Sequence, residues 1–211
     1  MKTDELIRLL SQDAPVRMPL GRVLWLALAA GIAISAAVLL STVGLRHDLA
    51  SAIETGRVAF KIGVTLVLAV VAFGLVARIG RPGVPLKPSA LLLLLPLGLM
   101  VAAVGVELLV VPKDAWVARL IGRNAAFCLF FIPLLSLAPL AGFLAGLRQG
   151  APESPGLAGA AAGLAAGAIG AALYAWHCPD DSPLFGAAWY TLAISFVIAA
   201  GYASGRRWLR W

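Results

Sequence analysis

The sequence predicts an all-α fold, a polytopic membrane bundle of six transmembrane helices, from three observations. Residues of the hydrophobic set make up 61% of the 211 positions and charged residues 13%, whereas a soluble domain is about 45–50% apolar and about 25% charged. Glycine is abundant and aromatic residues are few, which favours packed helices over a lipid-facing barrel. Finally, the apolar residues form six runs of about 20, the length that crosses a bilayer. A water-soluble fold is excluded.

The predicted spans are Val23 to Val43, Val58 to Ala77, Ala90 to Val111, Asn124 to Leu147, Gly156 to Trp176 and Ala187 to Ala203. The connectors are short and rich in glycine, proline and charge, so no soluble domain fits between the spans. We therefore expect three regions: an N-terminal amphipathic segment (1–22), a transmembrane domain (23–205) and a basic tail (206–211). The first run is too long for a typical signal peptide, and we expect it to stay uncleaved.

The basic residues predict the orientation of the spans. One side carries eleven Lys and Arg residues: Lys2, Arg8, Arg17, Arg22, Arg78, Arg81, Lys87, Arg148, Arg206, Arg207 and Arg210. The other side carries five: Arg46, Arg57, Lys113, Arg119 and Arg123. Because cytoplasmic connectors retain more basic residues, we expect both termini in the cytoplasm. The net charge of +7 is then mostly a topology signal, and no direct nucleic-acid binding is expected.

The fifth predicted span consists almost entirely of glycine and alanine. Gly159, Gly163 and Gly167 recur every four residues on one face, a spacing that lets two helix backbones approach closely. We expect this helix at the centre of the bundle, with the small residues serving packing rather than lining a pore.

Two ionisable residues, Lys61 and Glu107, fall inside the spans, both in the outer third. We expect them to form an intramembrane ion pair or to belong to a sensory site. The span middles are otherwise almost free of polar groups. This argues against the alternative class, a small membrane transporter or metal-efflux component, because such proteins place polar groups along their pathway.

The predicted outer face gathers groups that bind metals or oxidise. Cys128 lies early in the fourth span and Cys178 follows the fifth, and the same layer holds the possible metal or supporting ligands His47, Glu107, His177, Asp180 and Asp181. Two thiols with imidazole suit zinc, cadmium or another thiophilic metal, and two close thiols suit a disulfide. Alternatively, the cysteines are buried structural residues, and Asp180 forms an Asx-type turn.

No enzyme is predicted. A CxxC motif, an HExxH motif and a phosphate-binding glycine loop are all missing from the sequence, and the missing CxxC also counts against a membrane thiol oxidoreductase served by a quinone.

The first residues predict a short amphipathic helix that binds a protein partner. An N-cap and first-turn acids precede apolar positions at helical spacing, and the expected contact residues are Thr3, Asp4, Glu5, Leu6, Ile7, Leu9 and Leu10. A helix this short is marginal in water, so it needs a partner groove. The alternative is an interfacial helix that rests on lipid.

Several segments resemble the negative regulator of sigma-F family of bacterial membrane anti-sigma factors. The most specific is Trp176-His177-Cys178-Pro179-Asp180-Asp181-Ser182-Pro183, followed by Trp189-Tyr190. The opening Lys2-Thr3-Asp4-Glu5-Leu6-Ile7 and the closing Arg206-Arg207-Trp208-Leu209-Arg210-Trp211 also fit. Gly44-Leu45-Arg46 with Asp48-Leu49 fits as well, but His47 stands between them where the family pattern leads us to expect proline. This departure either gives the outer face an extra ligand or is neutral drift in a loop.

The resemblance implies a function. It implies a six-span protein of the bacterial inner (cytoplasmic) membrane that holds an extracytoplasmic-function sigma factor inactive and releases it under metal or oxidative stress. The family's response cysteines correspond to Cys128 and Cys178. No resident cofactor is implied, although zinc or cadmium would bind transiently at the thiols. The N-terminal segment, with the basic second connector, is the expected contact with the sigma factor.

Overall fold

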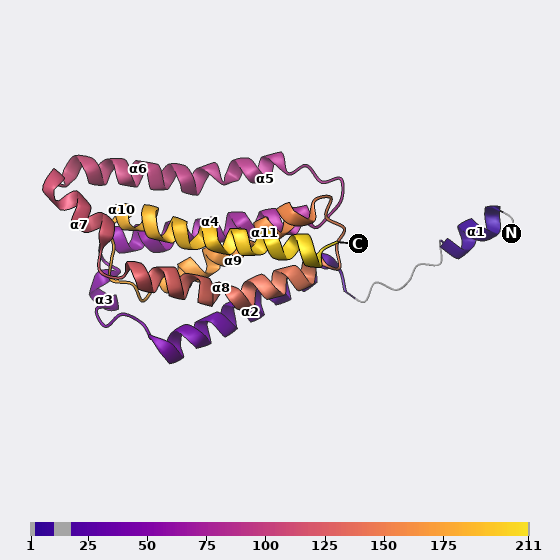
Figure 1. Cartoon of the computed structure of the whole chain (residues 1–211), viewed down its shortest axis with the longest axis horizontal. Helices are drawn as coiled ribbons and strands as arrows, with labels where there is room; N and C mark the ends of the chain where they lie inside the picture. The colour runs from indigo at the N-terminus through magenta and orange to yellow at the C-terminus, as the bar shows by residue number, and fades with distance from the viewer. Residues whose placement is uncertain (1–2, 11–17, 211) are drawn as a thin grey trace.

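The computed structural model describes residues 3–10 and 18–210, and within these ranges every regular element is helical (Figure 1). Six helices are long and apolar enough to cross a membrane, as predicted. They are α2 (Leu20–Thr42), α4 (Gly56–Ile79), α5–α6 (Lys87–Leu92 and Leu94–Val110), α8 (Ala125–Leu147), α9 (Pro155–Tyr174) and the α10–η2–α11 helix (Pro183–Phe185, Gly186–Tyr190 and Thr191–Trp208). The short elements are α1 (Thr3–Leu10), α3 (Leu49–Ala52), η1 (Lys113–Ala115) and α7 (Trp116–Ile121).

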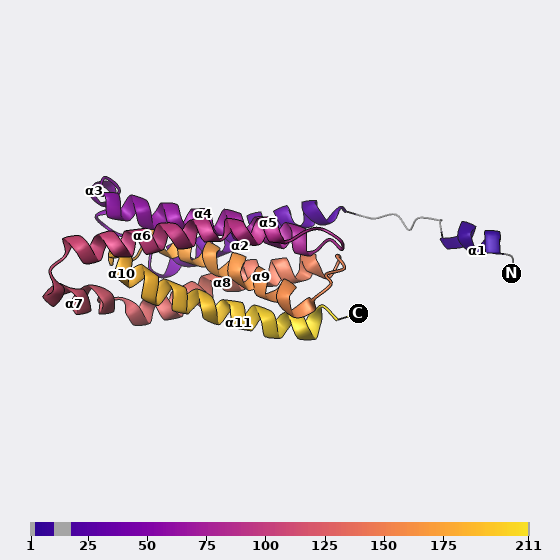
Figure 2. The ribbon, with the colours of Figure 1, turned by 90° about the horizontal axis from the view of Figure 1, so that it is seen from above.

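Helix α9 forms the core of the bundle, which confirms its predicted central position. It packs against α11, α8 and α4 (Figure 2). A Cβ atom added at Gly159 or Gly163 would overlap the backbone of α11, and one added at Gly201 would overlap the Gly159 carbonyl oxygen. Glycine is therefore required on both helices, because their backbones touch without intervening side chains.

Helix α8 packs along α2 and contains two prolines, Pro133 and Pro139. Because Pro139 has no N–H group, the Leu135 carbonyl oxygen lacks its helical donor. Ser35 of α2 replaces that donor, with its hydroxyl 2.6 Å from the Leu135 oxygen. Gly31, one turn earlier on α2, faces the backbone of Pro139. The sequence thus joins α2 and α8 near mid-bundle through a hydrogen bond and a close backbone contact.

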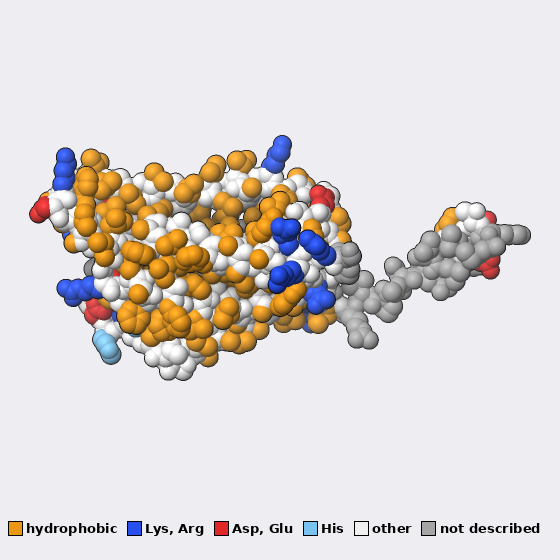
Figure 3. Space-filling model, in the orientation of Figure 1, with side chains coloured by type: hydrophobic (Ala, Val, Ile, Leu, Met, Phe, Trp, Pro, Cys, Tyr) orange, Lys and Arg blue, Asp and Glu red, His pale blue; other side chains and the backbone are white. Residues whose placement is uncertain are grey.

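The α5–α6 span lies on the flank of the bundle. The span is interrupted at Leu93, between the two helices. Only 11% of the residues in its most apolar stretch are buried inside the protein. Apolar side chains cover the flank, while Lys and Arg side chains gather at its ends (Figure 3). This banding is typical of a surface that faces lipid.

The bundle has two chemically different ends. At the first, which we term the basic end, α2 begins and α11 ends, and the connectors after α4 and α8 meet through a hydrogen bond from Ala151 N–H to the Gly80 oxygen. At the opposite end, which we term the thiol end, lie α3, α7 and the loop of residues 175–182. The predicted orientation, with the basic end in the cytoplasm, stays a prediction.

Candidate functional site: a buried dithiol and its ion-pair clamp

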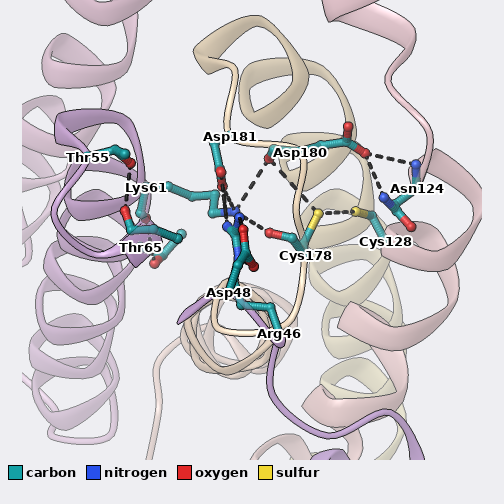
Figure 4. Close-up of polar contacts among 11 residues, drawn as sticks. Arg46, Asp48, Thr55, Lys61, Thr65, Asn124, Cys128, Cys178, Asp180 and Asp181 are labelled. Carbon is teal, nitrogen blue, oxygen red and sulfur yellow. Dashed lines mark hydrogen bonds and ion pairs between the residues drawn. The ribbon is translucent and has the colours of Figure 1, made fainter. Parts of the chain in front are cut away.

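The structure brings both cysteines together at the thiol end (Figure 4). Cys128 lies in the first turn of α8, and Cys178 follows α9, where its N–H donates to the Tyr174 carbonyl oxygen at 3.0 Å. The two Sγ atoms are 3.9 Å apart, neither side chain is exposed, and the thiols are free. Since a disulfide bond is about 2.05 Å long, a small displacement of either segment would allow one to form.

Lys61 of α4 anchors the loop that carries Cys178. Its ammonium group donates to the Cys178 carbonyl oxygen at 2.6 Å and to Asp181 Oδ1 at 2.5 Å, with the Asp180 carbonyl oxygen at 3.4 Å. Lys61 is buried, and a buried charge is tolerated only when paired and hydrogen-bonded. The three oxygens meet that requirement and fix the loop to α4.

Arg46 ties the same loop to the end of α2. It donates to Asp181 at 2.9 Å and, through Nε, to Asp48 at 2.7 Å, while its backbone N–H donates to the Trp176 oxygen. The hydrogen bond from Arg46 lowers the pKa of Asp48 to about 2, and the same carboxylates raise the pKa of Arg46. We call Arg46, Lys61 and Asp181 the clamp, because together they join α2, α4 and the Cys178 loop.

Asp180 stabilises the start of the cysteine-bearing helix α8. Its Oδ2 accepts hydrogen bonds from the N–H groups of Arg123 and Asn124, at 3.1 and 2.9 Å, and from Asn124 Nδ2 at 3.0 Å. A carboxylate is favourable at a helix N-terminus, where N–H groups lack partners. Asp180 therefore joins the two cysteine-bearing segments, a role that the Asx-turn alternative did not anticipate.

The predicted ion pair between Lys61 and Glu107 is wrong. Lys61 pairs with Asp181 instead, and the buried Glu107 pairs with Arg57 at 2.8 Å and Arg119 at 2.7 Å. Arg57 lies one helical turn closer to the start of α4 than Lys61, and it reaches Glu107 of α6 while Lys61 reaches the Cys178 loop. The Ser182 hydroxyl also donates to Glu107, at 3.1 Å, which connects this second ion-pair group to the same loop.

The predicted metal ligands do not converge on the thiols. His177 Nδ1 lies 3.0 Å from the Gly44 carbonyl oxygen, and His47 is exposed. Among the described residues, no three His, Cys, Asp or Glu side chains are grouped closely enough to hold a metal ion. The two thiols supply two of the four ligands that zinc normally takes, whereas a disulfide needs only the two sulfur atoms.

The surroundings of Cys178 favour its thiolate. Its hydrogen bond with Cys128 and the positive charge of Lys61 lower the pKa of Cys178, although burial opposes them. A thiol with a lowered pKa is the better nucleophile in disulfide chemistry. Two buried tyrosine hydroxyls, of Tyr174 and Tyr190, pack in the same cluster as the thiols and have no hydrogen-bond partner among the described residues.

The N-terminal segment forms the predicted helix as α1, Thr3–Leu10. Thr3, Asp4, Glu5 and Ile7 are exposed, and the side chains of Leu6, Leu9 and Leu10 lie outside the described part. Sequence reasoning missed Arg46, Arg57, Asn124 and Tyr190. Of these, Tyr190 and Arg46 carried a signal, because they stand in the Trp189-Tyr190 pair and in the Gly44-Leu45-Arg46 segment that support the family resemblance.

The fold, with six helices long and apolar enough to cross a membrane, is that of a multi-pass helical bundle compatible with a membrane protein, and its candidate site among the described residues is a buried dithiol. Residues 10–211 match the family described as negative regulator of sigma F, NrsF, and the chain belongs to this family.

Two curated relatives align over the full length of both chains. A probable anti-sigma-F factor from Azospira oryzae is 32% identical over 213 positions, and an anti-sigma-F factor from Caulobacter vibrioides is 35% identical over 215. No solved structure is significantly similar. These relatives are regulatory proteins rather than enzymes, which confirms the predicted absence of an enzymatic function.

Proposed function

We propose that this protein is an anti-sigma factor of the bacterial inner membrane, which holds an extracytoplasmic-function sigma factor inactive and releases it when Cys128 and Cys178 form a disulfide. Full-length similarity to two anti-sigma-F factors carries the first half of the proposal. The 3.9 Å separation of the two buried thiols supports the second half.

The sigma factor docks on α1 in this proposal. The helix has eight residues, with acids in its first turn, and so short a helix needs a partner to stay folded. Its exposed Asp4, Glu5 and Ile7 offer an apolar and acidic contact surface. The basic connector with Arg78, Arg81 and Lys87 adds charged contacts at the same end of the bundle as the start of α2.

The release signal travels along α8 to α2. Disulfide formation moves the first turn of α8. Further along the same helix, Pro139 contacts Gly31 of α2, and the Leu135 carbonyl oxygen accepts a hydrogen bond from the Ser35 hydroxyl of α2. Further along, Gly146 packs on Leu24, in the first turns of α2. Helix α2 follows α1 in the chain, so a displacement of α8 at the thiol end reaches the segment that holds the partner.

The energetic requirement of this switch is moderate. Converting a population from 1:99 to 99:1 takes about 5.5 kcal/mol of differential stabilisation. For a two-electron dithiol couple, about 30 mV corresponds to about 1.4 kcal/mol, so the two states need to differ by about 120 mV in the reduction potential of the cysteine pair. By linkage, bound sigma factor raises that potential by the same amount, because it favours the reduced form.

Oxidation is the signal that the site fits best. Zinc or cadmium binding at the thiols stays a prediction. Zinc normally takes four ligands, and among the described residues no third His, Cys, Asp or Glu side chain lies close enough to the two thiols to share a metal ion.

The first test is a pull-down of the tagged protein from its native membranes, beside a variant lacking residues 1–22. We expect a sigma factor with the full chain and none with the truncated one. A sigma factor recovered with both would move the contact to the connectors and tail. Recovery with neither would refute the anti-sigma assignment and favour the transporter class.

The second test uses Cys128→Ser and Cys178→Ser. Each should keep sigma-factor binding and lose release on oxidation. Normal induced release in either variant would refute the disulfide switch while leaving sequestration intact.

A further inference from the structure

The two ends of the bundle differ in how their cations are balanced. Among the described residues every ion pair lies at the thiol end, where it involves Arg46, Arg57, Lys61 or Arg119. The basic end of the described bundle carries a larger set of cations: Arg22, Arg78, Arg81, Lys87, Arg148, Arg206, Arg207 and Arg210. The acidic residue near them is Glu153, whose carboxylate accepts a hydrogen bond from the Gly83 N–H at 3.1 Å. The charge of the basic end is therefore available to anions outside the bundle.

Three of these cations share one pocket. It is a surface pocket of about 490 Å³ at the end of α11, lined by Tyr202, Ala203, Arg206, Arg207 and Arg210. All of these lining residues are exposed. The opposite face of α11 is fixed, because Gly201 and Gly205 lie against the backbone of α9. The guanidinium groups are thus presented together on one side of an anchored helix.

The pocket lies where the apolar flank of the bundle ends. Figure 3 shows Lys and Arg side chains gathered at this end, beside a broad apolar surface. The Arg206 guanidinium carbon is 5.8 Å from the centroid of the Tyr202 ring, and Tyr202 lies one turn closer to the middle of the bundle. This cation–π contact turns Arg206 back toward the apolar flank.

Packing against α9 holds the same two side chains in place. A Cβ added at Gly156, at the start of α9, would meet the Tyr202 ring at 2.7 Å and Arg206 Cγ at 3.1 Å. Tyrosine and arginine, with an apolar body and a polar tip, are typical of the level at which lipid head groups lie. The pocket therefore faces the head-group layer with its orientation already set.

We propose that this pocket binds the phosphate group of an anionic phospholipid. Guanidinium groups bind phosphate oxygens through two parallel N–H···O bonds, and basic pockets at the ends of membrane helices bind anionic head groups. A zwitterionic lipid fits less well, because its ammonium group would lie among the guanidinium cations. The inference uses the membrane placement proposed above and is independent of the thiols and of the sigma factor.

An acidic protein surface is the competing occupant. A soluble partner approaches the end of the bundle, where it would meet Arg207 and Arg210. Arg206, in contrast, is turned toward Tyr202 and the apolar flank. A phosphate in the head-group layer reaches all of the pocket's arginines, and the geometry therefore favours the lipid.

The test measures lipid retention by the purified full-length protein. The protein is exchanged into detergent micelles with equal amounts of dioleoyl phosphatidylglycerol and dioleoyl phosphatidylcholine, which differ only in the head group. Bound lipids are counted by native mass spectrometry, and we expect phosphatidylglycerol to be retained at least about tenfold better than phosphatidylcholine. Because a ligand stabilises the state that binds it, the protein should also melt at a higher temperature in phosphatidylglycerol nanodiscs than in phosphatidylcholine nanodiscs.

Two variants with the same loss of charge locate the site. They are the tail variant, Arg206→Gln with Arg207→Gln and Arg210→Gln, and the connector variant, Arg78→Gln with Arg81→Gln and Lys87→Gln. All of the substituted residues are exposed at the basic end. The tail variant should lose the preference for phosphatidylglycerol and the connector variant should keep it. Both should melt like the native protein in phosphatidylcholine nanodiscs, because neither change removes a buried group.

Four results would overturn the proposal. Equal lipid preference in the tail and connector variants would show that the overall charge of the basic end, and not the pocket, attracts the lipid. Equal retention of both lipids by the native protein would remove the anionic selectivity. Displacement of phosphatidylglycerol by millimolar inorganic phosphate would identify a site for free phosphate. A tail variant that keeps the lipid but no longer pulls down the sigma factor would assign the arginines to the protein partner. Each of these results leaves the disulfide switch untouched.

Discussion

Replacing Lys61 with methionine should weaken the clamp and slow thiol oxidation together. Methionine keeps the length and apolar stem of the side chain but loses the ammonium group. Asp181 then loses its partner at 2.5 Å, and the Cys178 carbonyl oxygen loses a donor at 2.6 Å. Both acceptors lie on the loop that positions Cys178, so the fold and the chemistry of the thiol change at once.

The expected destabilisation is moderate. Removing one partner of a buried ion pair costs about 3–5 kcal/mol, but Asp181 retains Arg46 at 2.9 Å and is partly exposed, which places the loss near the lower end, at about 3 kcal/mol. For a chain of this size about 1 kcal/mol corresponds to about 2–4 °C, so the melting temperature should fall by about 6–12 °C.

The thiol should respond in a defined direction. The hydrogen bond with Cys128 and the positive charge of Lys61 both lower the pKa of Cys178. Removing that charge in Lys61→Met should therefore raise the pKa of Cys178. Less thiolate is then present at neutral pH, and the rate of oxidation by the thiol oxidant diamide should rise only at higher pH than in the native protein.

The assay is a thermal melt in nanodiscs together with the pH dependence of the diamide rate. Lys61→Arg, which keeps the charge, should lie close to the native protein. Lys87→Met makes the same chemical change at an exposed position at the basic end and should alter neither property. An unchanged melting temperature and an unchanged pH profile in Lys61→Met would refute the clamp.

Three further predictions test other parts of the structure. Gly201→Leu drives a side chain into the Gly159 backbone and should lower the free energy of unfolding by about 3 kcal/mol or more, seen as loss of the monodisperse peak in size-exclusion chromatography. The control Gly63→Leu, where an added Cβ has nothing within 4 Å, should elute normally. Equal elution of the two variants would contradict the close packing of α9 on α11. Ser35→Ala leaves the Leu135 oxygen without its donor and should cost about 1 kcal/mol in an unfolding assay, whereas Ser41→Ala, which loses only an exposed bond within its own helix, should be neutral. The hydrogen bond from Arg46 lowers the pKa of Asp48 to about 2, below the value of about 3.9 for a free Asp. This bond therefore stabilises the folded protein fully above the free value, and the stabilisation is lost as the pH falls from there through about 2. An NMR titration of Asp48 with a midpoint near 4 would disprove the pairing.

The sequence predicted those features of the fold that depend on composition and spacing along the chain. Six apolar runs of bilayer length gave the six spans, and the four-residue spacing of Gly159 and Gly163 gave the central, closely packed helix. Both depend on local rules, since span length follows from bilayer thickness and close approach follows from the absence of side chains.

The side-chain partners at the thiol end could not be predicted in this way. Lys61 and Glu107 lie at a similar depth, which suggested a pair, but each partner depends on how α4 and α6 are rotated and on where the 175–182 loop crosses them. Arg46 and Asn124 were missed for the same reason, because each acts on an acidic residue more than fifty positions away. Depth can be read from the spacing along a chain, whereas rotation is set by tertiary packing.

The clamp at the thiol end and helix α8, which runs from the thiol end to the basic end, have opposite mechanical properties. The clamp holds the Cys178 loop rigidly to α2 and α4, through three buried or partly buried charges. Helix α8, in contrast, carries two prolines and lacks the backbone hydrogen bonds that these would have donated, so it bends more easily than its neighbours. In the proposed disulfide switch, drawing the two thiols together would therefore displace α8 rather than the clamped loop. The displacement would pass along α8 toward Gly31, Ser35 and Leu24 of α2, which is the direction that the proposed regulation through α1 requires. Pro139→Ala restores a helical donor to the Leu135 oxygen and stiffens α8, so it should reduce sigma-factor release by the oxidised protein without preventing disulfide formation, measured on the same sample by pull-down and by mass spectrometry. Full release by this variant would show that the signal does not pass through α8.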